Sequence, residues 1–394
     1  MEEWKTYKLG DLCNIHRGAS PRPIQKFLSD KGQPWVKISD ATSDSSRFIS
    51  TTKEFIIEDG IKHSVIVTPG TLIVSNSATP GLPKIMKIEA CVHDGWLIID
   101  QIRDCVLKEY LYYSFINIRR NLSNQANGSV FQNLKTEIVK NFEIKIPSLS
   151  KQRLIVDVLS SIEDKIELNN RINHNLEQQA QALYKSWFVD FEPFKDGKFV
   201  ESELGMIPEG WRVGPIYEYA NVIYGAPYKS TLFNESGDGL PLIRIRDLKD
   251  CSPQFYSPEV LPNTEYVLKG DIVAGMDADF TPYIWKGNKG LLNQRLCKFI
   301  PTSDSISRYY IMMLVKPDLE FVSSYKVGTT VSHLGKSDID KFTVILPPVE
   351  IVERYSRIAD SILEKIVNNS TEAARLIEQR DSLLPQLMSG KLTC

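Results

Sequence analysis

An internal repeat is the sequence feature that most constrains the fold of this chain. The segment from Trp4 to Asp40 recurs at an offset of 207, so that Trp4 aligns with Trp211 and Gly18-Ala19 aligns with Gly225-Ala226. Further along, pairs share an offset of 200, namely Gly70 and Gly270, Leu134 and Leu334, Phe142 and Phe342, and Pro147 and Pro347. Chance does not hold one offset over such distances, so the chain is a tandem duplication of a unit of about 200 residues.

Each copy of the repeat has two parts with different periodicity. Residues 1–147 and 207–347 contain short β-type runs, such as Val65–Val67 and Leu296–Ile300, separated by Gly, Pro, Asn and Asp. Helical stretches such as Lys108–Leu122 interrupt these runs. The pattern predicts an α+β protein with two tandem mixed α/β domains.

A long helix follows each mixed domain. Residues 151–187 contain neither Pro nor Gly, and apolar residues recur at helical spacing. We expect the seam of the two helices to be Ile155, Ile162, Asn169, Leu176 and Leu183 in the first, and Ile362, Asn369, Leu376 and Leu383 in the second. A neighbouring stripe should support this seam, with Val158, Leu159, Ile166, Ile172 and Ala180 in the first helix and Ile358, Ile366 and Ala373 in the second. Two matching seams in one chain predict an antiparallel coiled coil and a pseudo-twofold repeat, although each helix could instead pack only on its own domain.

Two asparagines occupy equivalent positions in this seam. Asn169 and Asn369 are 200 residues apart and replace an apolar residue in each helix. A buried asparagine can fix the register of a coiled coil at some cost in stability. The alternative is a solvent-facing asparagine at the edge of the apolar stripe.

Catalytic and membrane classes find no support in the sequence. The spacing from Gly328 to Gly335-Lys336-Ser337 is too long for a phosphate-binding loop, and Pro317-Asp318-Leu-Glu320 more simply starts or ends a helix. The histidines lack metal-ligand spacing, and no apolar run is long enough for a membrane span. Six scattered cysteines fit a reducing cytoplasm.

The duplicated order of several motifs resembles the specificity subunit of type I restriction-modification systems. The most specific segments are Ala182-Leu-Tyr-Lys-Ser-Trp-Phe-Val-Asp-Phe-Glu-Pro-Phe and Leu204-Gly-Met-Ile-Pro-Glu-Gly-Trp. Others are Trp4-Lys-Thr-Tyr-Lys-Leu-Gly-Asp-Leu, Leu240-Pro-Leu-Ile-Arg-Ile-Arg-Asp-Leu and Leu292-Asn-Gln-Arg. The resemblance covers essentially the whole chain.

This resemblance implies an organisation and a set of partners. Residues 1–147 and 207–347 would be target recognition domains, 148–190 and 348–394 the spacer helices, and 191–206 a linker. Each domain would read one half of a bipartite site on double-stranded DNA. Two methyltransferase subunits and a restriction subunit would bind S-adenosylmethionine, ATP and Mg²⁺ and supply the catalysis. This chain would hold no cofactor and no metal, and it would not contact a membrane.

Base-reading residues are expected in the loops where the two copies diverge. Arg, Lys, Asn and Gln favour base edges, so the candidates in the first domain are Asn76, Lys84, Gln132 and Asn133. The corresponding candidates in the second domain are Asp277, Lys286, Thr330 and His333. For each candidate in both domains, the alternative is an ordinary solvated loop residue. Trp187 and Phe188, near the end of the first helix, are candidates for partner docking, with packing under the second domain as the alternative.

The net charge of −2 gives no global sign of nucleic-acid binding. It therefore keeps open a different class of protein, a two-domain coiled-coil adaptor that binds proteins and not DNA. A DNA-modifying enzyme with an unrecognised site is a third alternative. Binding that depends on DNA sequence and weakens as salt rises separates a DNA reader from an adaptor.

Overall fold

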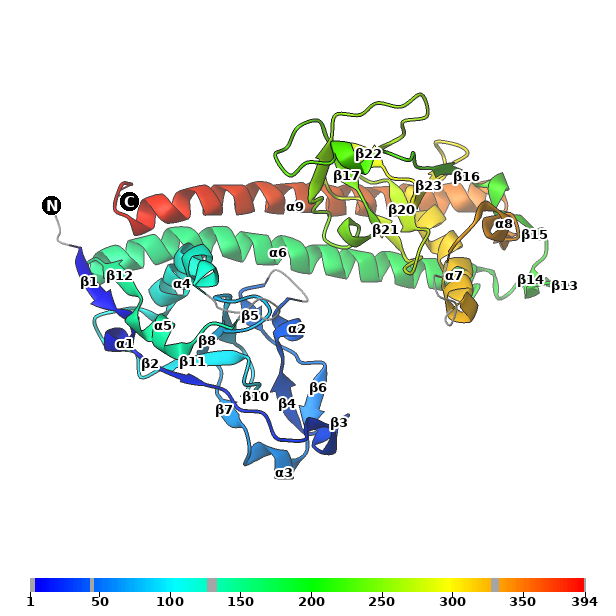
Figure 1. The fold of residues 1–394 in the computed structure, drawn as a ribbon. Coiled ribbons are helices and arrows are strands. Elements are labelled where there is room, and N and C mark those ends of the chain that lie inside the picture. The colour runs from blue at the N-terminus through cyan, green and yellow to red at the C-terminus, as the bar shows by residue number, and fades with distance from the viewer. Residues whose placement is uncertain (1–3, 43–45, 126–132, 327–332, 393–394) are drawn as a thin grey trace. The chain divides into compact units, whose positions relative to one another are not determined.

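The computed structural model describes residues 4–42, 46–125, 133–326 and 333–392. Its fold divides into two compact units, one formed by Met1–Glu167 with Arg375–Cys394 and the other by Leu168–Ala374. Two 40-residue helices, α6 (Leu149–Phe188) and α9 (Val349–Met388), contribute to both units (Figure 1).

The first unit contains two five-stranded sheets and a separate strand pair. One sheet has the order β2 (Asn14–Arg17), β11 (Trp96–Asp100), β8 (Leu72–Ser75), β9 (Pro83–Met86) and β5 (Phe48–Ile49). The other has the order β3 (Leu28–Ser29), β6 (Glu54–Ile56), β4 (Gln33–Val36), β10 (Ala90–Val92) and β7 (Val65–Val67). The strands β1 (Lys5–Lys8) and β12 (Glu143–Ile146) pair antiparallel. The helices are α1 (Leu9–Leu12), α2 (Ile38–Ala41), α3 (Glu58–Ile61), α4 (Lys108–Asn124) and α5 (Thr136–Asn141), with a 3₁₀ turn η1 (Ile24–Lys26).

The second unit repeats this topology with shorter sheets. One sheet has the order β16 (Ala220–Tyr224), β23 (Leu296–Pro301), β20 (Ile272–Gly275) and β21 (Pro282–Ile284). The other has the order β18 (Phe255–Ser257), β17 (Leu240–Ile243), β22 (Gly290–Leu292) and β19 (Tyr266–Val267). The paired strands are β15 (Arg212–Pro215) with β24 (Thr343–Leu346), and β13 (Phe199–Ser202) with β14 (Gly205–Pro208). The helices are α7 (Arg308–Lys326) and α8 (Lys336–Ile339), and the 3₁₀ turns are η2 (Glu192–Phe194), η3 (Ile216–Glu218), η4 (Ser230–Leu232) and η5 (Ile245–Asp247).

The strand pairings confirm the internal repeat and the α+β class. The β2-β11-β8-β9 order of the first unit matches β16-β23-β20-β21 of the second. In the other sheet of each unit, one central pair is parallel, β4 with β10 and β17 with β22. Both copies thus fold the same way although few of their residues are identical.

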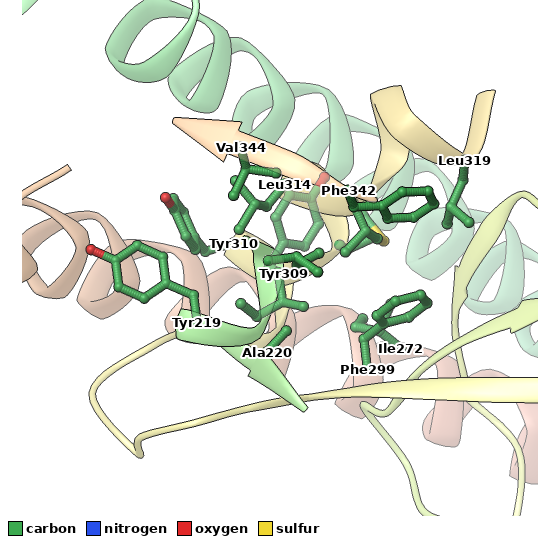
Figure 2. Close-up of a cluster of buried hydrophobic side chains, with 14 of the residues drawn as sticks. Tyr219, Ala220, Ile272, Phe299, Tyr309, Tyr310, Leu314, Leu319, Phe342 and Val344 are labelled. Carbon is green, nitrogen blue, oxygen red and sulfur yellow. The ribbon is translucent and has the colours of Figure 1, made fainter. Parts of the chain in front are cut away.

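A helix following the last long strand covers one face of a sheet in each unit. In the first unit, Tyr110, Tyr113 and Phe115 of α4 are buried in a cluster that also holds Ile155 of α6 and Leu387 of α9. In the second unit, Tyr309 and Tyr310 of α7 pack with Phe299, Phe342 and Val344 (Figure 2). The core of the second unit also contains Tyr184 of α6 and Tyr355 of α9, so in both units the mixed domain packs against the two long helices.

The prediction that Pro317–Glu320 starts or ends a helix is wrong, because α7 continues through Pro317. A proline inside a helix removes one backbone hydrogen bond and crowds the preceding turn. Here Leu314 and Val315 before the proline and Leu319 and Val322 after it are all buried, so core packing on both sides offsets the cost.

The two long helices run antiparallel in each unit. In the second unit, Asn169 of α6 donates to Glu372 of α9 at 2.8 Å, whereas Tyr355, near the start of α9, donates its hydroxyl to the carbonyl of Ala180. In the first unit, Arg380 of α9 donates to Glu163 of α6 at 3.3 Å. Residue numbers that rise along one helix pair with numbers that fall along the other, as the repeat predicts.

Both seam asparagines are buried, with Asn169 1% and Asn369 8% exposed, so neither is the solvent-facing residue of the alternative. Asn369 donates to the Asn173 side chain at 2.9 Å, and Asn173 donates to Ser370 at 2.9 Å. Of the other seam residues, Ile155 is buried, whereas the remaining six are only partly buried, namely Ile162, Leu176, Leu183, Ile362, Leu376 and Leu383.

The more deeply buried stripe of α6 is therefore the neighbouring one, which was expected only to support the seam. It includes Leu159, Ile166 and Ala180, because the mixed domain covers part of the helix beside the α9 contact. None of the described helices is long and apolar enough to cross a membrane.

Candidate nucleic-acid interface

Four loops converge at one end of the sheets in the first unit. We call them the first loop cluster, which comprises Gly18–Arg22, Asn76–Gly81, His93–Gly95 and Asn133–Leu134. Backbone bonds join the four loops, from Gly18 to Trp96 (2.9 Å), Ala19 to Val92 (3.1 Å), Asn76 to Gly95 (2.8 Å) and Leu134 to Asn76 (2.7 Å).

The second unit builds the same cluster from equivalent residues. The second loop cluster comprises Gly225–Lys229, Met276–Thr281, Asn293–Arg295 and His333–Leu334. Its bonds run from Gly225 to Leu296 (3.1 Å), Ala226 to Leu292 (3.0 Å), Met276 to Arg295 (2.8 Å) and Leu334 to Met276 (2.7 Å). The duplication has therefore kept a backbone scaffold in which four chain segments meet.

Two glycines make this meeting possible. A Cβ on Gly18 would lie 2.4 Å from the carbonyl oxygen of His93, and one on Gly225 would lie 2.0 Å from that of Asn293. Both distances are far below van der Waals contact. The repeated Gly-Ala pair thus marks the point where each first strand passes the backbone of another loop.

The hairpin loops between β8 and β9 and between β20 and β21 also share an unusual backbone conformation. Ala78 and Ala278 have φ values of 58° and 61°, in the left-handed region that residues with a side chain rarely adopt. Such conformations cost free energy and persist only where the surroundings impose them. Their presence in both copies shows that the shape of this loop has been kept.

The side chains on the two scaffolds differ. In the first cluster, Asp94 accepts from Ser20 at 2.7 Å and from Arg22 at 2.9 Å, and the Nε2 of His93 lies 3.1 Å from the same carboxylate. The backbone N–H of Gly95 donates to Nδ1 of His93, which places the ring proton on Nε2, facing Asp94. These groups border a hollow of about 790 Å³ that Lys37 and Glu54 also line.

The pKa values of this group follow from its surroundings. Burial lowers the pKa of His93 and outweighs the carboxylate of Asp94, which acts in the opposite sense. For Asp94, burial acts to raise the pKa, but the hydrogen bond from Ser20 and the neighbouring His93 and Arg22 together lower it below its ordinary value. A neutral histidine, an ionised aspartate and an arginine therefore lie side by side.

In the second cluster the same three residue types occupy different positions. Asp277 lies 2.7 Å from Nδ1 of His333 and 3.2 Å from Nε of Arg295. The arginine comes from the β22–β23 loop, which is equivalent to the β10–β11 loop that supplies His93 and Asp94 in the first unit. One backbone scaffold thus presents two different arrangements of an arginine, an aspartate and a histidine.

Four of the eight base-reading candidates lie in the two loop clusters. Asp277 and His333 meet in the second loop cluster, and the exposed Asn133 belongs to the first. Asn76 is also in the first cluster, but its side chain is 0% exposed and donates to the carbonyl of Asp94, so the expectation of an exposed amide is wrong. Gln132 and Thr330 lie outside the described residues.

The two lysine candidates lie away from the loop clusters. Lys84 is 4% exposed and donates to the carbonyl of Ser46, so its expected exposure is also wrong. Lys286 is partly buried and donates to Glu177 on α6 at 2.9 Å. Each lysine therefore has a partner within the protein, the Ser46 carbonyl for Lys84 and the Glu177 carboxylate for Lys286.

The two candidates for partner docking, Trp187 and Phe188, differ in their burial. Phe188 is buried among Tyr184, Tyr310 and Tyr355. This location corresponds to the alternative to partner docking, in which Phe188 packs under the second domain. Trp187 is partly buried, and the guanidinium of Arg354 lies 5.6 Å from its ring centroid.

Sequence reasoning missed Arg22, Asp94 and Arg295. Signals for two of them were present, because Arg22 follows the repeated Gly18-Ala19 pair and Arg295 closes the Leu292-Asn-Gln-Arg motif. The loops that bring each of them to a carboxylate come from distant parts of the chain, and hydrophobic periodicity does not reveal such a meeting.

Comparison with known proteins agrees with this architecture. The family described as the type I restriction modification DNA specificity domain matches residues 1–178 and again 208–379, so the chain belongs to this family. The type I restriction enzyme MjaIX specificity subunit of Methanocaldococcus jannaschii is 29% identical, over 99% of this chain and 94% of that protein. The HindI specificity subunit of Haemophilus influenzae is 23% identical over the full length of both.

A solved structure extends the comparison to the fold. The crystal structure of a type I restriction-modification S subunit from M. genitalium gives a TM-score of 0.53 at 15% sequence identity, covering 98% of this chain and 96% of that one. The family match and the two named relatives identify this chain as a non-catalytic specificity subunit of a type I restriction enzyme. They do not favour the protein-binding adaptor.

Proposed function

We propose that the two loop clusters read the two halves of a bipartite sequence on double-stranded DNA. The observation that carries this proposal is the repeated backbone scaffold with different side chains. A homodimer presents identical surfaces and suits a palindrome, whereas one chain with two diverged copies can read two different half-sites. Residues 1–147 and 207–347 would then be the target recognition domains, 148–190 and 348–394 the spacer helices, and 191–206 the linker between them.

The partners follow from the same proposal. Two methyltransferase subunits would dock on this chain, and a restriction subunit would complete the complex in the cytoplasm. S-adenosylmethionine, ATP and Mg²⁺ would be bound by those subunits. The family and the relatives named as specificity subunits support this assignment. A net charge of −2 fits a reader whose partners supply much of the phosphate contact.

DNA selection tests the proposal directly. The full chain, expressed with its methyltransferase subunit, is incubated with a library of randomised 30-base-pair duplexes, and the bound duplexes are sequenced. We expect enrichment of two short motifs at a fixed spacing, with binding that weakens steeply as salt rises. Binding without sequence preference, or no binding at any salt concentration, would contradict the proposal.

A matched control isolates the contribution of the loop clusters. Gly225→Ala places a methyl group against the Asn293 carbonyl and should disturb only the second cluster, whereas Gly205→Ala has open space around its Cβ, although its φ of 98° also disfavours a side chain. The first change should abolish enrichment of one motif, and the second should keep both.

A further inference from the structure

Each loop cluster holds one exposed arginine whose guanidinium is bound by an aspartate. The side chain of Arg22 is 80% exposed and that of Arg295 is 55% exposed, yet both are tethered at one nitrogen. A guanidinium carries five N–H groups, so a single contact leaves most of them available to a ligand. An exposed arginine with a fixed orientation is what a specific polar contact requires.

The aspartates are themselves held in place. Asp94 is fixed by Ser20 and His93, and Asp277 by His333. The backbone of each loop is in turn bonded to the hairpin loop, through Asn76 and Gly95 or through Met276 and Arg295. Each arginine is therefore held by a carboxylate that has at least one further partner of its own.

The charge arrangement favours a base edge over a phosphate. A phosphate would be repelled by the neighbouring carboxylate, and a lone arginine or lysine would bind it better. The major-groove edge of a G·C pair offers both complements, since guanine O6 and N7 accept two hydrogen bonds from arginine and cytosine N4 donates one to a carboxylate. A paired arginine and aspartate thus match one G·C pair.

We propose that Arg22 and Arg295 are specificity-determining residues that each read one guanine, one in each half-site, and that Asp94 and Asp277 orient them and accept a hydrogen bond from the paired cytosine. This inference rests on the proposed function, because it assumes that the loop clusters face DNA. It adds the recognised base and the residues that recognise it. It also explains why the two loop clusters can arrange their arginine, aspartate and histidine differently on the same backbone. Each cluster needs only to orient one arginine toward the DNA.

The same selection from randomised duplexes tests the inference, with Arg22→Ala and Arg295→Ala compared with the unchanged chain. The unchanged chain should select at least one guanine in each half-site. Arg22→Ala should lower the preference for guanine by about 10- to 100-fold at one position of one half-site and leave the other half-site unchanged. Arg295→Ala should do the same in the other half-site, so each variant is the control for the other.

Conservative variants separate reading from structure. Arg22→Lys keeps the charge but not the two-pronged geometry, so it should fail to restore the guanine preference. Asp94→Asn and Asp277→Asn should weaken the preference at the same positions as the arginine variants. Arg120→Ala removes an exposed arginine on α4 and should leave both motifs intact. Thermal unfolding should change little for the arginine variants, because their side chains are exposed and exposed ion pairs contribute little to stability.

The remaining outcomes contradict the inference in distinguishable ways. If both arginine variants weaken all sequences equally and make the salt dependence shallower, they contact phosphate. If the selected motifs are unchanged or contain no guanine, the arginines do not read bases although the proposed function stands. If the unchanged chain selects no motif, the proposed function fails and this inference fails with it.

Discussion

At the scale of single residues, buried charge is distributed unequally between the two copies. In the first unit, Glu163 of α6 lies between Arg47 and Arg380, at 3.5 and 3.3 Å. Burial raises the pKa of Glu163, and the two arginines act in the opposite sense. The positions equivalent to Glu163 and Arg380 in the second unit are Leu363 and Ala180, which are both buried. Equivalent positions on the long helices thus hold an ion pair in one copy and buried apolar side chains in the other.

Asp318 is the residue whose protonation we expect to be visible in the stability of the second unit. Its carboxyl borders a hollow of about 250 Å³ lined by Tyr184, Phe188 and Pro317, and burial raises its pKa to about 6 from an ordinary value of 3.8. The folded state therefore binds this proton more tightly than the unfolded state. Stability that is present below about pH 4 should be lost as the pH rises to about 6.

The Asp318→Asn variant tests this linkage. It removes the titrating group, so its melting temperature should exceed that of the unchanged chain above pH 6, and the difference should vanish toward pH 4. Thermal unfolding followed by circular dichroism between pH 4 and pH 8 measures the effect. Asp304→Asn, at an exposed position, serves as the control. An equal shift at every pH would contradict the assigned cause.

Residue-scale features also show the limit of prediction from sequence. Asn76 and Lys84 have residue types that suit base edges, but one donates to a neighbouring loop and the other to the Ser46 carbonyl. A sequence pattern reports which side chains are polar and not which way they point. The reverse error concerns Arg22, which was overlooked because its partner Asp94 is 72 residues away.

At the scale of elements, the long helices were the most predictable part of the chain. Their absence of internal Gly and their apolar spacing extend over many turns, so the signal accumulates, and α6 and α9 end within a few residues of the expected bounds. The seam was less accurate. Ile358, expected to support it, is 44% exposed, because a helix that also packs on a domain has a broader and rotated apolar face.

The asparagine pair between the helices gives a prediction at this scale. Asn369→Leu removes the donor to the buried Asn173 and leaves a polar group without its partner, so it should cost about 1–3 kcal/mol. The double variant Asn173→Leu with Asn369→Leu replaces both partners by apolar groups and should recover much of that loss. Melting temperatures of the single and double variants measure the coupling in a double-mutant cycle.

Two outcomes would contradict this account. Additive losses in the double variant would mean that the two amides do not depend on one another. A single variant as stable as the unchanged chain would mean that Asn173 finds another partner at no cost. His174→Leu, which changes an exposed residue of α6 next to Asn173, provides the control.

At the scale of the whole molecule, each long helix passes from one unit into the other. The crossing lies between Glu167 and Leu168 in α6, and between Ala374 and Arg375 in α9. Since α6 is one continuous helix, its length fixes how much chain lies between the first mixed domain and the second. We therefore propose that the helices set the number of unread base pairs between the half-sites.

Lengthening both helices at the crossing tests this role. Four residues inserted after Glu167 and four after Ala374 add about 6 Å of helix and keep the antiparallel partners on each side in register. Because one base pair rises 3.4 Å, the unread gap in the selected DNA should grow by one or two base pairs while both motifs stay the same. Inserting only after Glu167 puts the two helices out of register and should lower the melting temperature. A gap that stays fixed in the double insertion, or motifs that change with it, would show that the helices do not set the spacing.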